Sequence, residues 1–501
     1  MSYFSFWMAK SLIIAQIFLF SCGFFLHAVN AQKTNNPNII YILADDLGFG
    51  EIGAYGQQKI KTPNLDRLAA DGMRFTRHYS SAPVCAPSRF MLLTGNHAGH
   101  AYIRGNYELG GFEDRNEGGQ MPIYEGVPTI AEVLKERGYK TAMIGKWGLG
   151  MPHNTGSPLL HGFDQYYGYL DQKQAHNLYP THLWNNDRRD TLRNHSIMVH
   201  TNLDSIKNRP YEYYIGQEFA PQKLTEKALD FLEENKNNPF FLYFPTPLPH
   251  LSLQVPEEWV SMYKGKFEET PYDGGKGYAP CKYPLSTYAG MISYLDHQIG
   301  QILDKIDELG LSKNTIIMFS SDNGTTFLPF VRPDFFGSTA GLRGYKMELY
   351  EGGIRVPFIA KWPGKIVPGS VSDHLSAQYD IYNTIADITG ETKENDGISM
   401  LPVFISDKKN HPNHEYLYFE YPENGGQIAI ISGEWKGIKK NLIQNPDAPW
   451  ELYLLTADPQ ESSNLADQLP QMLQKMDEIV KKSHRCAHIK EWEILDKKDR
   501  K

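Results

Sequence analysis

The sequence predicts an α/β fold in which a large, mostly parallel sheet is sandwiched between helices. Three observations point to it: short apolar segments without polar alternation, helix signals between those segments, and polar residues directly after them. A continuous apolar run is typical of a strand buried on both faces, and strands that alternate with helices build a parallel sheet. The ligand site of such a sheet is expected at the carboxyl ends of its strands.

Four apolar segments are the expected central strands. They are residues 39–44, 141–144, 240–244 and 316–319. Helices are expected between them, because Pro63 follows Thr62 as a helix start and because Thr129 and Glu132 form a capping box. Two longer amphipathic helices are expected over residues 224–234 and 287–309.

After about residue 395 the pattern changes to short strands joined by turns. The expected strands are residues 415–421, 427–432, 435–440 and 451–456, followed by a helix over 468–482. This predicts a smaller antiparallel α+β subdomain at the C-terminus. We therefore divide the chain into a leader over 1–31, a catalytic domain over 32–395 and a subdomain over 396–501.

The first 31 residues have the pattern of a secretory signal peptide. Lys10 precedes an apolar run over residues 11–29, and small residues around Ala31 suit cleavage. The alternative is an N-terminal membrane anchor, since the run has anchor length. No other segment approaches that length, so no stable membrane span is expected in the mature chain. We predict a secreted or periplasmic protein.

Composition excludes several classes of protein. The chain has 501 residues, 41% of them hydrophobic, so it is neither disordered nor collagen-like. Lys plus Arg total 50 against 58 Asp plus Glu, a net charge of −8, which argues against nucleic acid as a partner. The mature chain keeps Cys85, Cys281 and Cys486, so two could pair in an oxidising compartment and leave one thiol to be explained.

Oxygen-bearing side chains follow two of the expected strands. Asp45 and Asp46 follow the first strand, and Asp322 and Asn323 follow the last. Carboxylates brought together in this way need a cation to offset their repulsion. Oxygen ligands alone suit Ca²⁺, with Mg²⁺ next. The alternative is that both pairs are ordinary turn residues after strands.

The segment from Cys85 to Arg89 reads Cys-Ala-Pro-Ser-Arg. Pro87 fits the first turn of a helix that continues to Leu93, which places Cys85 at the helix N-terminus. Free N–H groups and the helix dipole favour an anion there. A lone cysteine can equally be a buried apolar residue, and spacing alone leaves both interpretations open.

The Cys85-x-Pro87-Ser88-Arg89 segment resembles the signature of the type I sulfatases, the formylglycine-dependent arylsulfatase-like enzymes of the alkaline phosphatase superfamily. The resemblance covers nearly all of the mature chain, which resembles bacterial polysaccharide sulfatases more than mammalian lysosomal ones. Blocks in the family order are residues 38–50, 62–75, 85–95, 145–150, 322–324, 341–357, 450–453 and 458–465. The resemblance implies an alkaline phosphatase-like fold and hydrolysis of sulfate esters, expected on sulfated carbohydrates, with release of inorganic sulfate.

The resemblance also implies a cofactor set. A separate maturase would oxidise Cys85 to formylglycine (3-oxoalanine), whose hydrated form is a diol, and one hydroxyl of the diol would attack sulfur. Ca²⁺ would be held by that diol together with Asp45, Asp46, Asp322 and Asn323.

The family positions of the remaining catalytic groups fall on four residues. Arg89 and Lys146 match residues that orient and neutralise the nucleophile. Lys346 matches the lysine that contacts sulfate, and His250 matches the histidine that protonates the leaving alcohol. The alternatives are solvated lysines and a histidine that caps a loop.

The chain departs from the family at Gly148. The family usually has Gly-Lys-Trp-His-Leu-Gly, whereas residues 145–150 here are Gly-Lys-Trp-Gly-Leu-Gly. His176 is a candidate replacement that would support turnover or bind substrate; a loop histidine that contacts a sugar or nothing is the alternative. Aromatic residues and Asn over 166–184 are expected to stack on a sugar and to form hydrogen bonds with it.

Two other functions remain open at this stage. The same nucleophile could serve a phosphonate monoester or phosphodiester hydrolase. The absence of the usual histidine at Gly148 also allows a glycan-binding protein on an inactive scaffold, although the complete metal set and the Cys85 segment oppose it.

Overall fold

The computed structural model describes residues 36–111, 114, 117–200, 209–391, 394–407 and 409–495. The proposed signal peptide, residues 1–31, lies outside these ranges. None of the helices within them combines the length and apolar character that crossing a bilayer requires. Residues from Pro37 onward form one compact unit.

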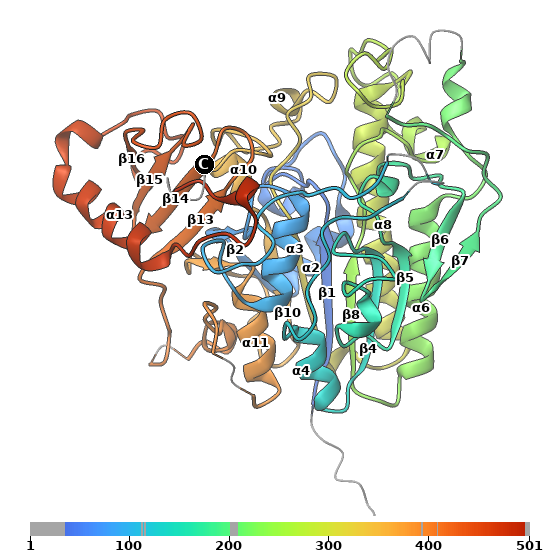
Figure 1. The fold of residues 1–501 in the computed structure, drawn as a ribbon. Helices are drawn as coiled ribbons and strands as arrows, with labels where there is room; N and C mark the ends of the chain where they lie inside the picture. The colour runs from blue at the N-terminus through green and yellow to red at the C-terminus, as the bar shows by residue number, and fades with distance from the viewer. Residues whose placement is uncertain are drawn as a thin grey trace, which may run out of the picture. The chain divides into compact units, whose positions relative to one another are not determined.

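The larger sheet has ten strands and is mostly parallel at its centre (Figure 1). In sheet order the strands are β11 (Ser370–Ser372), β2 (Met73–Phe75), β10 (Phe358–Lys361), β9 (Thr315–Ser321), β1 (Asn38–Ala44), β8 (Phe240–Pro245), β4 (Lys140–Lys146), β5 (Gln165–Tyr169), β6 (His182–Asn185) and β7 (Arg188–Thr191). The five strands from β9 to β5 are parallel, while β10, β6 and β7 are antiparallel to their neighbours. The expected mostly parallel sheet is confirmed.

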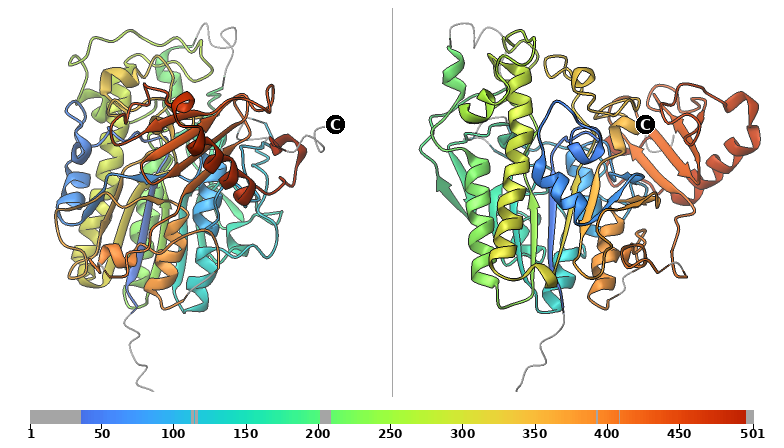
Figure 2. Two further views of the ribbon diagram at one scale, coloured as in Figure 1. Left: turned by 90° about the vertical axis from the view of Figure 1, so that its left-hand side faces the viewer. Right: turned by 180° about the vertical axis from the view of Figure 1, so that it is seen from behind.

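Each central strand is buried on both faces, as its continuous apolar sequence predicts. In β1, Ile40 and Ile42 pack into one core while Ile39 and Tyr41 pack into the other. Residues of α2 (Pro63–Ala70), α6 (Ala220–Asn235) and α8 (Pro284–Glu308) cover the first face. Residues of α3 (Cys85–Thr94), α4 (Ile130–Glu136) and α11 (Asp380–Ile388) cover the second, and Figure 2 shows the two layers from other directions.

Helix α4 begins where its capping box predicts. Glu132 N donates to Thr129 Oγ1 at 3.3 Å, and Thr129 N donates to Glu132 Oε2 at 2.7 Å. These reciprocal bonds satisfy two backbone donors that a helix start otherwise leaves unpaired.

The C-terminal strands form a separate four-stranded antiparallel sheet. Its strands, in order, are β13 (Leu417–Tyr421), β14 (Gln427–Ser432), β15 (Trp435–Lys439) and β16 (Glu451–Leu454). Helix α13 (Pro470–Ser483) packs on one face, and residues 349–354 and 375–379 pack on the other. Lys436 of β15 lies 2.9 Å from Glu351 Oε1 and 3.0 Å from Glu461 Oε1, all three buried, so the small sheet is held to α10 (Glu351–Ile354).

Shorter elements complete the fold. They are β3 (His78–Tyr79), β12 (Ser376–Ala377), α7 (Glu257–Ser261), α9 (Pro333–Phe336), α12 (Leu401–Phe404), η1 (Gly53–Tyr55), η2 (Pro158–Leu160), η3 (Gln174–His176), η4 (Tyr211–Tyr214), η5 (Ser312–Asn314), η6 (Ala466–Gln468) and η7 (Lys490–Trp492).

Candidate active site

Four neighbouring strands deliver polar side chains to one edge of the larger sheet. In sheet order, β9 is followed by Asp322, β1 by Asp45 and β8 by the loop that carries His250, while β4 ends in Lys146. Because these strands are parallel and adjacent, their carboxyl ends meet at that edge. The structure therefore brings together residues that are far apart in the chain.

The acidic residues after β1 and β9 contact one another directly. Asp46 N donates to Asp322 Oδ1 at 3.0 Å, and Asn323 Nδ2 donates to Asp46 Oδ1 at 2.7 Å. Asp46 has φ of 65°, the left-handed backbone conformation that non-glycine residues adopt rarely. Asp45 completes the cluster, and all four side chains are buried.

This cluster fits a cation with oxygen ligands. Oδ1 of Asn323 is buried and has no hydrogen-bond partner among the described residues. This carbonyl oxygen can therefore bind a cation. Burial, together with the charge of Asp45, raises the pKa of Asp322 to about 7. A divalent ion would bind the unpaired oxygen of Asn323 and would also offset the repulsion between the carboxylates.

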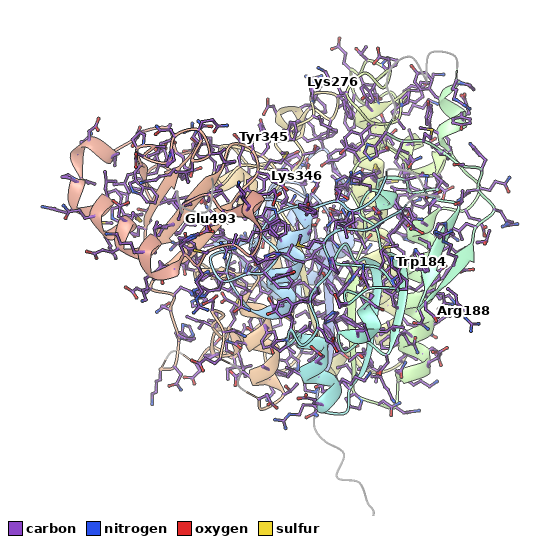
Figure 3. The ribbon with its side chains drawn as sticks, viewed as in Figure 1. Trp184, Arg188, Lys276, Tyr345, Lys346 and Glu493 are labelled. Atoms are coloured by element: carbon purple, nitrogen blue, oxygen red, sulfur yellow. The ribbon has the colours of Figure 1, made fainter. Side chains whose placement is uncertain are left out.

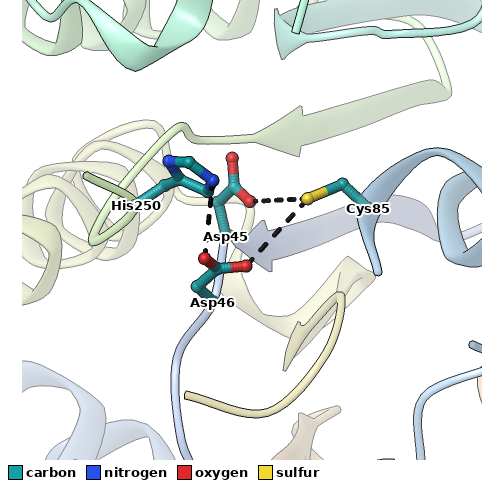
Figure 4. A group of neighbouring side chains, drawn as sticks. All are labelled: Asp45, Asp46, Cys85 and His250. Carbon is teal, nitrogen blue, oxygen red and sulfur yellow. Dashed lines mark hydrogen bonds and ion pairs between the residues drawn. The ribbon is translucent and has the colours of Figure 1, made fainter. Parts of the chain in front are cut away.

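Cys85 is the first residue of α3, a helix whose ten residues are all buried. Its Sγ lies 3.4 Å from Asp45 Oδ1 and 4.0 Å from Asp46 Oδ1, as Figure 4 shows. One ligand atom from each of these residues and from His250 lies within 4.8 Å of the others. Burial raises the pKa of the Cys85 thiol well above its usual value. Asn106 Oδ1 accepts from Ala86 N at 3.1 Å and so occupies one N–H of this helix start.

Each carboxylate of the cluster has its own cationic partner. Arg89 donates to Asp322 Oδ2 from Nε at 3.1 Å and from Nη2 at 2.8 Å. Lys146 Nζ donates to Asp45 Oδ2 at 2.6 Å. Arg89 also donates to the carbonyl oxygen of Lys146 at 2.7 Å, which ties α3 to the end of β4. All these side chains are fully buried, so the charges interact with little solvent screening.

Lys346 reaches the cluster from a loop outside the sheet. Its Nζ lies 2.8 Å from Asp46 Oδ2 and 3.6 Å from Cys85 Sγ. The loop is held because Lys346 N donates to Thr325 O at 2.9 Å. A Cβ on Gly352 would lie 2.2 Å from Gly344 O, so this close backbone approach requires glycine.

His250 points one ring nitrogen into the cluster. Its Nδ1 lies 2.6 Å from Leu251 O, a carbonyl that can only accept, so Nδ1 carries the proton and Nε2 is the acceptor. Nε2 lies 3.1 Å from Lys346 Nζ and 3.5 Å from Asp46 Oδ2. Burial, assisted by Lys346, lowers the pKa of His250 to about 4.

The structure places His176 against His250. The two rings stack with centroids 4.2 Å apart at 14°, and Ser252 N donates to His176 O at 2.9 Å. His200 lies behind His176, with Nε2 of His200 2.7 Å from Nδ1 of His176. His200 Nδ1 donates to Gly277 O at 3.1 Å, so its Nε2 accepts from His176, and Nε2 of a neutral His176 keeps its lone pair. Burial lowers the pKa of both His176 and His200.

Gln172 fills the space that a side chain at residue 148 would need. A Cβ on Gly148 would lie 2.5 Å from both Cγ and Nε2 of Gln172, and Gly148 has φ of +76°. Gln172 is buried, and its backbone N–H donates to Gln120 Oε1 at 3.0 Å. Gln172 therefore occupies the space into which a side chain at residue 148 would project.

Three features of the site differ from the sequence-based expectations or go beyond them. The tyrosines over residues 166–179 are buried in the core, so the expected sugar-stacking surface is wrong there; three of them lie on β5, a strand internal to the sheet. His200 and Gln172 lie in loops without a local pattern, and only the tertiary fold shows their role. Within the described ranges, Cys85, Cys281 and Cys486 are thiols and no disulfide joins them.

The comparisons with known proteins agree with this geometry. The family model described as Sulfatase matches residues 37–391, and the model described as N-sulphoglucosamine sulphohydrolase, C-terminal, matches residues 344–498. The N-acetylgalactosamine-6-O-sulfatase of Bacteroides thetaiotaomicron is 30% identical over 90% of this chain and 94% of its own. The N-acetylgalactosamine-6-sulfatase of Homo sapiens is 30% identical over 74% of this chain and 66% of its own.

Solved structures of other proteins have a similar fold. The crystal structure of Ps i-CgsB in complex with k-i-k-neocarrahexaose is 27% identical, with a TM-score of 0.71 over 89% of this chain and 93% of that chain. The phosphonate monoester hydrolase of Agrobacterium radiobacter, at 18% identity and a TM-score of 0.62, shares the fold. The chain belongs to the sulfatase family. It is a sulfuric ester hydrolase with an alkaline phosphatase-like fold.

Proposed function

We propose that this enzyme removes sulfate from sulfated carbohydrates with a formylglycine made from Cys85 and a Ca²⁺ ion at the strand ends. The observation that carries the proposal is the buried oxygen cluster beside Cys85, in which Oδ1 of Asn323 has no hydrogen-bond partner among the described residues. The carbohydrate substrate is supported by the names of the relatives, which act on N-acetylgalactosamine sulfate.

The metal ligands in this proposal are Asp45, Asp46, Asp322, Asn323 and residue 85. Four oxygen donors with three negative charges match the preference of Ca²⁺ better than that of Zn²⁺. When bound, the cation supplies a Lewis acid, and the oxidised form of Cys85 supplies a hydroxyl nucleophile. A separate maturase is the proposed source of that oxidation.

The protein's own cations hold the substrate sulfate and the charge that develops on it. Lys346 Nζ, 3.6 Å from Cys85 Sγ, is positioned to contact a sulfate oxygen above residue 85. Lys146 and Arg89 bind the carboxylates of Asp45 and Asp322, hold them in place and favour their charged forms. Because these groups are buried and already oriented, little reorganisation accompanies the reaction.

His250 is the proposed acid that protonates the leaving alcohol. Its Nε2 faces the cluster at 3.1 Å from Lys346 Nζ, so the lysine can first transfer a proton to Nε2, and Nε2 then gives that same proton to the leaving oxygen. His176, which stacks on His250, is proposed to bind substrate or to assist turnover through its unprotonated Nε2. Unchanged kcat and KM in His176→Ala would overturn that role.

Two further assignments rest on the sequence. A signal peptide over 1–31 supports secretion or a periplasmic location. The division at about residue 395 is supported by the separate small sheet, although residues 349–379 pack against that sheet.

The test is sulfate release from a panel of sulfated mono- and oligosaccharides that begins with N-acetylgalactosamine 6-sulfate. Protein matured in a formylglycine-competent host and supplied with Ca²⁺ should release sulfate. Cys85→Ala should release none, while Cys281→Ser, a thiol outside the site, should match the parent protein. With formylglycine confirmed at residue 85, hydrolysis of phenyl phosphonate exceeding that of every sulfate ester would refute the proposal.

A further inference from the structure

The C-terminal segment gathers a histidine, a cysteine and a glutamate outside the candidate active site. His484 directly follows α13, Cys486 is two residues further, and Glu493 follows η7; Figure 3 labels Glu493 on this segment. One ligand atom of each residue lies within 4.8 Å of the other two. Sulfur, nitrogen and oxygen donors at this spacing can hold a transition metal.

The contacts of His484 fix which nitrogen is available. Its Nδ1 lies 2.6 Å from Glu420 Oε1, and a carboxylate can only accept, so Nδ1 carries the proton. Arg104 Nη1 donates to Glu420 Oε2 at 2.9 Å and balances that charge. A carboxylate behind one ring nitrogen is the usual support of a metal-binding histidine, because it orients the ring and makes the other nitrogen more basic.

The other nitrogen, Nε2 of His484, faces the other two candidate ligands. It is buried and makes no hydrogen bond to any described residue, although it lies 3.3 Å from Glu493 Oε1. Two atoms bonded to zinc at the tetrahedral angle lie about 3.3–3.4 Å apart, so the observed pair already has this separation. Glu493 is held in place because Leu495 N and Ala487 N donate to its two oxygens at 2.8 and 2.9 Å.

We propose that His484 Nε2, Cys486 Sγ and Glu493 Oε1 bind a divalent transition-metal ion such as Zn²⁺. Binding forms a metal–sulfur bond and releases the thiol proton to solvent, which Cys486 reaches because it is exposed. One thiolate and one carboxylate then balance the two positive charges of the ion, and water takes the fourth position. A thiolate and an imidazole distinguish this site from the oxygen-only cluster at residue 85, which prefers Ca²⁺.

The competing state is a protonated His484 held between two glutamates. Without metal, burial lowers the pKa of His484, but the neighbouring carboxylates of Glu420 and Glu493 outweigh burial and raise the pKa to about 9. A bound metal takes the place of the proton on Nε2, and that proton leaves to solvent together with the thiol proton. The two states differ in whether the sulfur of Cys486 takes part, so a sulfur-specific signal separates them.

The test is a Co²⁺ titration of the full chain carrying Cys85→Ala, with Ca²⁺ present to occupy the oxygen cluster. We expect one equivalent of Co²⁺ to give near-ultraviolet thiolate-to-cobalt absorption, and Zn²⁺ to displace it. Adding Cys486→Ser, an exposed position whose change should not affect folding, should abolish the band. Adding Cys281→Ser should leave it intact.

A second measurement uses stability. Zn²⁺ should raise the unfolding temperature of the Cys85→Ala chain and leave that of Cys85→Ala/Cys486→Ser unchanged, because only the native state presents all three ligands. Absence of the thiolate band, or a band that survives Cys486→Ser, would overturn the proposal. Each result is independent of sulfate release.

Discussion

Replacing Gly148 by alanine should show how tightly Gln172 occupies the space beside the active site. Two costs add at this position. An L-residue in the left-handed region costs about 1–2 kcal/mol, and Gly148 has φ of +76°. The new Cβ would also lie 2.5 Å from two atoms of the buried Gln172, and overpacking of this kind costs about 1–3 kcal/mol.

Gly265 is a matched control for the backbone cost. It has φ of +78° and no atom within 4 Å of the position that its Cβ would take. Gly265→Ala should therefore lower the free energy of unfolding by the backbone cost alone, whereas Gly148→Ala should lower it by about 2–5 kcal/mol.

Urea unfolding of the parent protein, the single variants Gly148→Ala, Gly265→Ala and Gln172→Ala, and the double variant Gly148→Ala/Gln172→Ala measures these differences. The double variant should lose less stability than the two single changes at 148 and 172 predict together, because the contact between them is gone. Equal losses for Gly148→Ala and Gly265→Ala, or full additivity in the double variant, would refute the conclusion that Gln172 occupies the space beside Gly148.

Three further predictions test other parts of the molecule. Burial lowers the pKa of His78 to about 3, so this histidine stays neutral in the folded state while the unfolded state takes up a proton. The free energy of unfolding should therefore fall by up to about 1.4 kcal/mol per pH unit between pH 6.5 and about pH 3. Chemical unfolding at several pH values should show a weaker dependence of this free energy on pH for His78→Gln. Lys436→Met should cost about 3–5 kcal/mol in the same assay, because it removes the buried cation that lies between the carboxylates of Glu351 and Glu461; a loss under 1 kcal/mol would contradict this. Ca²⁺ should raise the unfolding temperature of chelator-treated protein, and the rise should be smaller for Asn323→Leu, which lacks the carbonyl oxygen that faces the cluster.

The sequence contains most of the information needed for the fold. The four apolar segments form the adjacent strands β9, β1, β8 and β4. A strand with apolar side chains on both faces is stable only where both faces of the sheet are covered by other parts of the protein. The C-terminal strands lie within a few residues of their predicted bounds, since turns with glycine or asparagine separate them.

The site could be predicted where a local motif marks it and not elsewhere. Cys85 and the acidic pairs follow recognisable strand and helix boundaries, and the structure places them together. Gln172 and His200 act through contacts with residues distant in the chain, and no periodicity or spacing signals such contacts. The tyrosines over 166–179 misled the prediction because an aromatic strand inside a sheet and an aromatic sugar platform have the same composition.

The separation of the site residues along the chain determines how late in synthesis the active site can form. Asp46 and Lys346 meet across 300 positions, and β1 lies between β8 and β9, which are synthesised much later. Strand β1 therefore has no sheet neighbour until β8 (Phe240–Pro245) has been made and lacks its second neighbour until β9 (Thr315–Ser321) follows, and such non-local parallel pairing is slow. During that interval the segment around Cys85 is not yet enclosed by the completed sheet. An oxidising enzyme would have to act within this interval, because the finished fold buries the thiol.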